Sequence, residues 1–160
     1  MKKITLFLVI ILAVIFIGKY ITRASIIHVD NSKDSKIVVD NRAQIIDNYF
    51  AKRNMPLEGY GQKMVEVADA NGLDWRLLPA ISIRETSGGK HMCRKNNPFG
   101  WGSCKIEFKT MNLAIETVGY KLNNMSVYKG KTTERKLYYY NGTVVPTYPK
   151  EVLAIMELIK

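Results

Sequence analysis

Apolar residues recur three and four positions apart in five stretches of the chain from residue 41 onward. Residues with this spacing share one face of an α-helix, so each stretch predicts an amphipathic helix that packs on a common core. The five predicted helices begin near Asn41, near residue 61, after the capping residue Asp74, after Thr110 and at Pro149. The pattern predicts a small, mainly α domain that covers residues 41–160.

Two segments interrupt this pattern. Residues 90–109 lack helical periodicity and are rich in Asn, Gly, Pro, Cys and aromatic residues, which predicts an irregular loop or a small β excursion. Residues 138–142, Tyr-Tyr-Tyr-Asn-Gly, predict either a packed edge with an Asn-Gly turn or a cluster that contacts a substrate. Within the third helix, Pro79 removes a backbone hydrogen bond, and we expect a kink near the start of that helix.

The N-terminal segment has a different pattern. Two lysines precede an almost wholly apolar run from Ile4 to Gly18, which has no polar face. Its length lies between the core of a signal peptide and the roughly 20 residues that span a bilayer. Because basic residues lie where a signal peptide would be cleaved, we favour an uncleaved transmembrane anchor over residues 1–21, followed by a linker at 22–40. An anchor places the domain in the cell envelope outside the membrane, and a cleaved signal sequence makes it a secreted protein.

The charge of the chain favours an anionic partner. Lys and Arg number 24 against 14 Asp and Glu, which gives a formal net charge of +10. Such an excess suits a nucleic acid, an acidic membrane surface or a cell wall with acidic groups, and ordinary solubility is the alternative. Basic and aromatic residues in segment 90–109 would suit a nucleic acid, but an exported protein rarely meets one, so we expect no nucleic-acid partner.

Cys93 and Cys104 are the two cysteines of the chain. An even number of cysteines in an exported protein predicts a disulfide, which would stabilise the fold by about 3 kcal/mol for so short a loop. The alternative is a zinc site that also uses His91, but the sequence offers only these three ligands close together. We therefore predict a disulfide and no metal site.

Glu85 is the main candidate for chemistry. On a helical wheel of the third helix it falls between Leu78 and Ile81, which define the buried face. A carboxyl group on an apolar face is costly unless it pairs with a cation or keeps its proton, and desolvation raises its pKa. A protonated carboxylic acid can donate its proton to the leaving oxygen of a glycosidic bond. A structural ion pair is the alternative, although the helix ends at Gly88 and Gly89, beside a loop where a cleft can form.

The loop after this helix offers side chains suited to a sugar. Phe99 and Trp101 have flat apolar faces on which sugar rings can stack, and Asn97 has both a donor and an acceptor. Core packing of the aromatic residues and turn formation by Asn are the alternatives.

Four motifs resemble a known superfamily. Residues 72–91, GLDWRLLPAISIRETSGGKH, resemble the catalytic helix of lytic transglycosylases and bacterial endo-β-N-acetylglucosaminidases, in which a catalytic Glu is followed by Ser or Thr. Residues 96–102, NNPFGWG, are similar to the Asn-Pro-Phe-Gly segment of glucosaminidase-like members. Residues 139–142, YYNG, resemble the Tyr-Asn-Ala-Gly motif of transglycosylases, and residues 148–156 resemble the helix that follows it. In order and spacing these motifs resemble the lysozyme-like superfamily.

This resemblance implies a lysozyme-like domain of the goose-type lysozyme and lytic transglycosylase kind. It implies cleavage of the glycan strands of peptidoglycan, with Glu85 as the catalytic acid. The residues that it places near the sugar or on the loop facing the cleft are Phe99, Trp101, Tyr139, Tyr140 and Asn141. We expect no cofactor.

The partner of Glu85 in the reaction stays open. Asp74, Glu107 and Glu116 are candidates for the second carboxylate of a hydrolase, although Asp74 is better explained as a helix cap and Glu116 lies off the apolar face. A single acid suffices if the hydroxyl or acetamido group of the substrate is the nucleophile, and the resemblance implies such a reaction for lytic transglycosylases. A non-catalytic module that binds peptidoglycan or serves as a scaffold is the alternative function.

Overall fold

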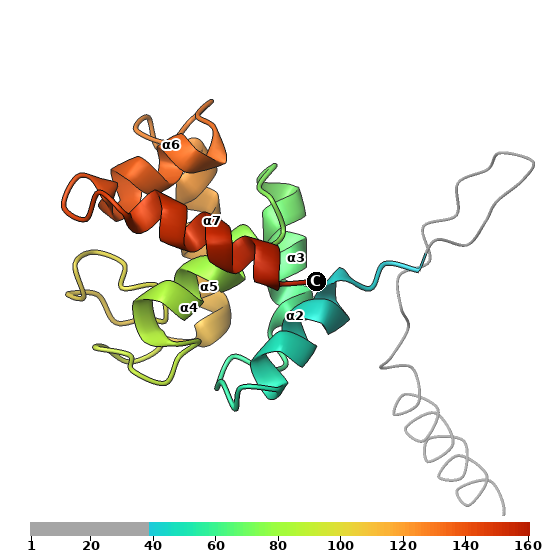
Figure 1. The fold of residues 1–160 in the computed structure, drawn as a ribbon. Helices are drawn as coiled ribbons and strands as arrows, with labels where there is room; N and C mark the ends of the chain where they lie inside the picture. Colours follow the sequence, from blue (N-terminus) through green and yellow to red (C-terminus); the bar gives the residue numbers. More distant parts are fainter. Residues whose placement is uncertain (1–38) are drawn as a thin grey trace, which may run out of the picture. The chain divides into compact units, whose positions relative to one another are not determined.

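The computed structural model describes residues 39–160. Within this part of the chain the backbone is helical or irregular and contains no β-strand, so the prediction of a mainly α domain is confirmed. The segment 90–109 is an irregular loop, and the small β excursion considered for it is not present. The elements, labelled as in Figure 1, are α2 (Arg42–Ala51), α3 (Gly61–Ala70), α4 (Leu77–Thr86), α5 (Met111–Asn124), α6 (Thr133–Leu137), the π-helical segment η1 (Tyr138–Gly142) and α7 (Tyr148–Leu158).

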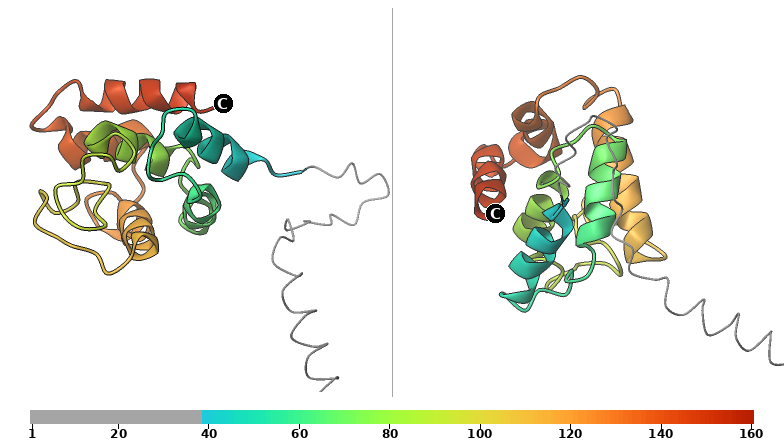
Figure 2. Two further views of the ribbon diagram at one scale, coloured as in Figure 1. Left: turned by 90° about the horizontal axis from the view of Figure 1, so that it is seen from below. Right: turned by 90° about the vertical axis from the view of Figure 1, so that its right-hand side faces the viewer.

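Helix α4 is the most deeply buried of these elements. Its first two turns bury Leu77, Leu78, Ala80 and Ile81 completely. The helix packs against α3 and α7, and Figure 2 shows α7 lying along it. A helix with apolar residues on all sides is typical of a protein core. The residues at the C-terminal end of α4, which include Glu85, are therefore held by a rigid support.

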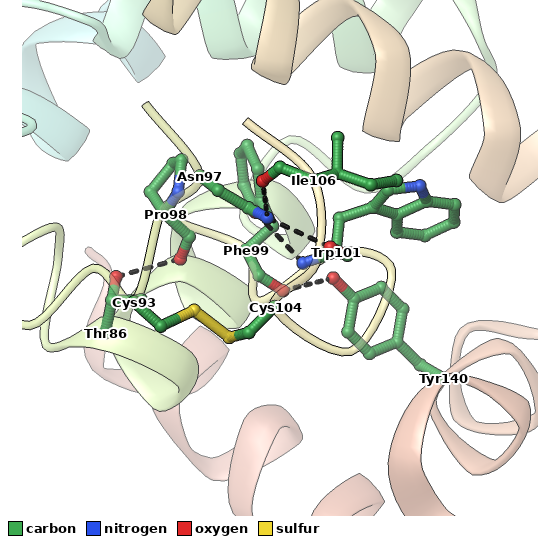
Figure 3. The surroundings of a disulfide bond; sticks show 9 residues. All are labelled: Thr86, Cys93, Asn97, Pro98, Phe99, Trp101, Cys104, Ile106 and Tyr140. Atoms are coloured by element: carbon green, nitrogen blue, oxygen red, sulfur yellow. Dashed lines mark hydrogen bonds between the residues drawn. A yellow bond between two sulfur atoms is a disulfide. The ribbon is translucent and has the colours of Figure 1, made fainter. Parts of the chain in front are cut away.

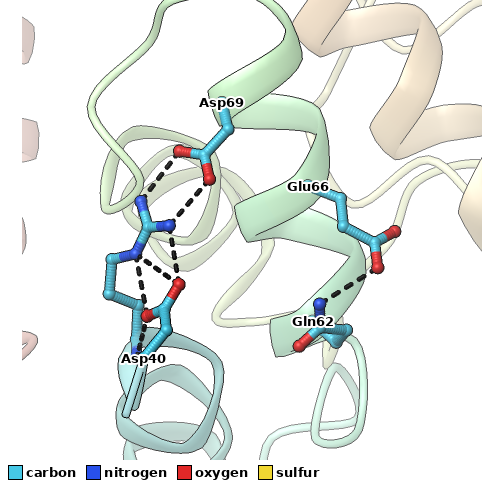
Figure 4. A network of polar contacts seen from close by, with 5 residues as sticks. Asp40, Gln62, Glu66 and Asp69 are labelled. Carbon is cyan, nitrogen blue, oxygen red and sulfur yellow. Dashed lines mark hydrogen bonds and ion pairs between the residues drawn. The ribbon is translucent and has the colours of Figure 1, made fainter. Parts of the chain in front are cut away.

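The start of α2 is joined to the end of α3 by an arginine between two carboxylates (Figure 4). The Arg42 guanidinium donates hydrogen bonds to both carboxylate oxygens of Asp69, at 2.7 and 2.8 Å, and to Asp40 at 2.7 Å. The hydrogen bonds from Arg42 lower the pKa of Asp40. Because exposed ion pairs contribute little stability one by one, this cluster serves mainly to orient α2 against α3.

Close packing of α2 on α3 requires a glycine at the first residue of α3. A Cβ atom at Gly61 would lie 2.3 Å from the backbone oxygen of Ala43 and 2.8 Å from Oδ1 of Asp47. The same Asp47 oxygen accepts hydrogen bonds from the backbone nitrogens of Gly59 and Gly61, at 2.9 and 2.8 Å. A side chain at residue 61 would therefore push the two helices apart.

We expect Gly61→Ala to destabilise the domain by about 1–3 kcal/mol, the usual range for overpacking a tight contact. The free energy of unfolding, measured by chemical denaturation, tests this expectation. Gln62→Ala, at the exposed next position of α3, is the matched control and should change it by less than about 0.5 kcal/mol. Equal stabilities of the two variants would contradict the proposed role of Gly61.

The start of α4 differs from the prediction. The helix begins at Leu77, and Asp74 instead caps the preceding turn, where its Oδ1 accepts a hydrogen bond from the backbone nitrogen of Arg76 at 2.9 Å. Pro79 is consequently the third residue of α4. Backbone nitrogens in the first turn of a helix have no acceptor within the helix, so proline removes no helical hydrogen bond there and gives no reason for a kink.

Residues 133–142 form a helical segment that the sequence analysis did not predict. The side chain of Thr132 caps α6 by accepting a hydrogen bond from the backbone nitrogen of Arg135 at 3.2 Å. The π-helical segment η1 continues α6 directly and packs on α7. The predicted Asn-Gly turn is therefore wrong: Asn141 and Gly142 belong to η1, and Gly142 is buried against Pro149.

The predicted N-terminal anchor or signal sequence, residues 1–21, lies outside the described residues, as does nearly all of the predicted linker at 22–40. No helix within residues 39–160 combines the length and the apolar character needed to cross a bilayer. The described chain from Asp40 to Lys160 forms one compact unit.

Candidate active site

A cavity of about 600 Å³ lies beside the C-terminal end of α4. Its lining comes from Glu85 on α4, residues 100–104 of the following loop, the segment after α5, and η1 with the turn that follows it. Glu85 is the only acidic residue among the described residues that line the cavity, and no basic residue is among them. The cavity therefore combines one carboxyl group with aromatic, aliphatic and uncharged polar neighbours.

Glu85 occupies the last turn of α4 and is partly buried. Burial raises its pKa above the ordinary value, and this effect exceeds the opposing effects of the Tyr148 hydroxyl and the Arg84 guanidinium. Arg84 itself forms an ion pair with Glu151 of α7, so its charge is partly compensated. A carboxyl group with a raised pKa holds its proton to higher pH than an exposed one, as a general acid requires.

Tyr148, the first residue of α7, lies beside Glu85 and was not identified from the sequence. Its ring is fully buried and stacks on Tyr140, with the ring centroids 5.9 Å apart and the planes 7° from parallel. Within residues 39–160, its hydroxyl is a buried side-chain group that has no partner in hydrogen-bonding geometry. Burial and then the charge of the neighbouring Glu85 raise the pKa of Tyr148. The hydroxyl therefore keeps its proton, and its nearness lowers the pKa of Glu85.

We expect Tyr148→Phe to raise the pKa of Glu85 further, because the tyrosine hydroxyl stabilises the ionised carboxylate. If activity requires protonated Glu85, the alkaline limb of the pH–activity profile should move to higher pH. The fold should keep its stability, since phenylalanine preserves the stacked ring and removes a buried group without a hydrogen bond. A pH–rate profile checks the first expectation and thermal denaturation the second; a shift of the alkaline limb to lower pH would contradict this role of Tyr148.

Asn97 holds the loop together and does not line the cavity. Its side-chain nitrogen donates to the carbonyl oxygens of Trp101 and Ile106, both at 2.9 Å, and its side-chain oxygen accepts from the nitrogen of Trp101 at 3.0 Å (Figure 3). The side chain is completely buried. Its donors and acceptor are satisfied within the loop, which corrects the prediction that they contact a sugar. Phe99 is also completely buried and belongs to the core, so it does not face the cavity as predicted.

The loop is joined to the end of α4 next to Glu85. The Thr86 hydroxyl donates a hydrogen bond to the carbonyl oxygen of Pro98 at 2.8 Å (Figure 3). The same hydroxyl accepts a hydrogen bond from the backbone nitrogen of Gly89 at 3.0 Å. A Cβ atom at Gly100 would lie only 2.8 Å from Oε2 of Glu85. The backbone at Gly100 therefore forms the surface against which the Glu85 carboxyl group rests.

An aromatic wall completes the cavity. The rings of Trp101 and Tyr140 lie 5.6 Å apart, and those of Trp101 and Tyr128 lie 6.5 Å apart. Tyr140 is fixed because its hydroxyl donates to the carbonyl oxygen of Phe99 at 2.6 Å. Trp101 and Tyr140 were predicted from the sequence, whereas Tyr128 was missed because it lies outside the recognised motifs.

Of the two remaining predicted residues, Asn141 and Tyr139, only one lines the cavity. Asn141 lines the cavity, whereas Tyr139 is not among its lining residues. The Tyr139 hydroxyl accepts a hydrogen bond from Arg135 at 3.1 Å on the exposed side of α6. Consecutive residues of a helix point in different directions, which explains why the two neighbours separate.

Comparisons with protein-family models, curated proteins and solved structures find no match to this chain.

The three other carboxylates considered from the sequence lie away from the cavity. Asp74 pairs with Arg76 at 2.8 Å, and Glu116 forms an ion pair with Lys63. Glu107 is exposed and is not among the residues that line the cavity. Among the described residues, no carboxylate other than that of Glu85 lines the cavity.

The predicted disulfide between Cys93 and Cys104 is confirmed. Because both thiols are used in this bond, the alternative of a zinc site built from them and His91 is wrong. Within residues 39–160 no group of three or more His, Cys, Asp or Glu side chains is arranged to hold a metal ion.

Proposed function

We propose that this protein cleaves the glycan strands of peptidoglycan, with Glu85 as the general acid and base. The observation that carries the proposal is the position of Glu85: it is the one carboxyl group on the described lining of the cavity, and burial raises its pKa. Such a group can protonate the oxygen of the leaving sugar and later take a proton from the attacking group.

The shape and chemistry of the cavity support a sugar as the ligand. Trp101 and Tyr128 provide aromatic surfaces on which the apolar faces of sugar rings can stack, and Asn141 provides a donor and an acceptor for hydroxyl or acetamido groups. A volume of about 600 Å³ is within the range of small-molecule sites. The net charge of +10 favours association with the anionic cell wall.

A cavity with one carboxyl group favours a nucleophile that the substrate itself supplies. Inverting hydrolysis needs a second carboxylate roughly 6.5–9.5 Å from the acid, and retaining hydrolysis needs one at about 5–5.5 Å. Asp74, Glu107 and Glu116 are not among the residues that line the cavity. The C6 hydroxyl of a muramyl residue would give a 1,6-anhydro product, as in lytic transglycosylases. An acetamido group would instead form a cyclic oxazolinium ion, which water would open to the hydrolysed product.

The resemblance of the motifs extends the proposal to the fold and the location. The domain would be lysozyme-like, with α4 as its catalytic helix. It would act in the cell envelope, held by an N-terminal anchor or secreted.

Digestion of purified, insoluble peptidoglycan tests the proposed function. The wild-type protein should release soluble fragments, which mass spectrometry assigns by their ends. Anhydromuramyl ends would identify a transglycosylase, and a reducing muramic acid or glucosamine end would identify the corresponding hydrolase. Binding to the insoluble material without release of fragments would overturn the proposal in favour of a non-catalytic wall-binding or scaffold module.

A further inference from the structure

The disulfide connects the outside of the loop to the wall of the cavity. Cys104 lines the cavity, whereas Cys93 is exposed. The segment between them carries Trp101 of the aromatic wall (Figure 3), and its residues Gly102 and Ser103 also line the cavity. The bond therefore joins the outside of the loop to the part of the cavity wall around Cys104.

The base of the loop is held by hydrogen bonds that do not depend on the disulfide. Asn97 binds both Trp101 and Ile106, and the Thr86 hydroxyl bonds to the carbonyl group of Pro98. The backbone nitrogen of Phe108 also donates to the carbonyl oxygen of Lys95 at 3.1 Å. These contacts would remain after the disulfide is broken.

The tip of the loop, residues 102–105, has weaker support. Within the described chain its hydrogen bonds are those from the nitrogen of Cys104 to the oxygen of Gly100, at 3.2 Å, and from the nitrogen of Lys105 to the oxygen of Gly102, at 3.1 Å. Both bonds run within the loop and connect the tip to no helix. Besides the hydrogen bond to Gly100, the disulfide is the cross-link that holds the tip to the rest of the loop.

The backbone of the tip is also strained. Ser103 and Cys104 are consecutive residues with positive φ angles of 52° and 60°. Left-handed backbone is unfavourable for residues with a Cβ atom, and two such residues in succession persist only where the surrounding structure holds them. Loss of the cross-link would allow the tip to relax away from this conformation.

We propose that the Cys93–Cys104 disulfide is a redox-sensitive brace of the cavity wall, and that its reduction by a dithiol weakens ligand binding in the cavity. A thiolate of the dithiol attacks the sulfur of Cys93, the exposed residue of the pair, and displaces the thiolate of Cys104. The second thiol then displaces the Cys93 thiolate and closes the disulfide of the reductant. Two electrons pass to the protein, and its two thiolates take up the protons that the dithiol loses. The inference rests on the proposed function only for the identity of the ligand.

The test compares the full chain in its oxidised form, after reduction with dithiothreitol, and as the double variant Cys93→Ser/Cys104→Ser. Hydrogen–deuterium exchange measures the backbone, and steady-state kinetics on soluble glycan strands measures the site. We expect amide exchange at residues 102–105 to rise by about tenfold or more on reduction, while exchange in α4 stays within about twofold. KM should rise about tenfold and kcat should change by less than about threefold. The double variant should resemble the reduced protein and should not respond to dithiothreitol.

Several outcomes would contradict the proposal that the disulfide braces the cavity wall. Unchanged exchange at residues 102–105 would show that the hydrogen bonds suffice, and a uniform rise across all helices would show that the disulfide stabilises the whole fold instead. A response of the double variant to dithiothreitol would assign the effect to another group. An unchanged KM despite faster exchange would remove the link to binding. If no form of the protein cleaves glycan, the proposed function fails, and the exchange result alone decides whether the brace exists.

Discussion

Glu85→Gln is expected to lower kcat for glycan cleavage by about 10²–10⁴-fold, the usual contribution of a general acid or base. Glutamine has nearly the same shape and fills the same place against Gly100, but its amide cannot donate a proton to the leaving oxygen. Binding should survive, so KM should change little. Initial rates of fragment release from peptidoglycan measure the effect. Thermal denaturation should show equal or higher stability, because the buried carboxyl group is replaced by a group that cannot ionise.

Glu107→Gln is the matched control for this prediction. Glu107 lies in the loop that follows α4, is the same residue type as Glu85 and is exposed outside the cavity. The control variant should retain the rate of the wild type. Equal rates for the wild type and Glu85→Gln would contradict the assignment of Glu85, and a selective loss in Glu107→Gln would instead identify the second carboxylate of a hydrolase.

The helices could be predicted from the sequence where one face of the helix is buried and the other is exposed. The apolar spacing in α2, α3, α5 and α7 follows this rule, and all four helices form at the predicted places. The cysteine pair also sufficed to predict the disulfide, because two cysteines in a protein predicted to be exported are expected to be oxidised.

Other features depend on contacts between distant segments. The segment Tyr138–Gly142 has a sequence typical of a turn, but packing against α7 stabilises a π-helical conformation. Asn97 was predicted to contact a sugar, and only the folded loop shows that its side chain instead forms hydrogen bonds with Trp101 and Ile106. Tyr148 reaches Glu85 from an element 63 residues away in the sequence, and no local pattern indicates such an approach.

The role of Gly100 also depends on a contact with a distant segment, although in the sequence it looks like a simple turn residue. Its φ angle of 59° belongs to the left-handed region that favours glycine. The structure adds a second requirement, since a Cβ atom would lie 2.8 Å from Oε2 of Glu85. Gly100→Ala therefore introduces backbone strain and also displaces the carboxyl group. We expect kcat to fall by about 10²-fold, because a displacement of about 1 Å at a catalytic group has effects of this size.

Gly102→Ala separates the two causes. Gly102 lies two residues further along the same loop, with a φ angle of 68°, and a Cβ atom there would lie 2.6 Å from the end of the Ile106 side chain. Both variants carry the cost of left-handed backbone, but only Gly100→Ala presses on Glu85. We expect Gly102→Ala to lower kcat by less than about tenfold while losing comparable stability. Measurement of kcat and of the free energy of unfolding for both variants distinguishes the two causes. Equal losses of kcat would assign the effect to the strain of the loop. A selective loss of kcat in Gly100→Ala would assign it to the position of the Glu85 carboxyl group.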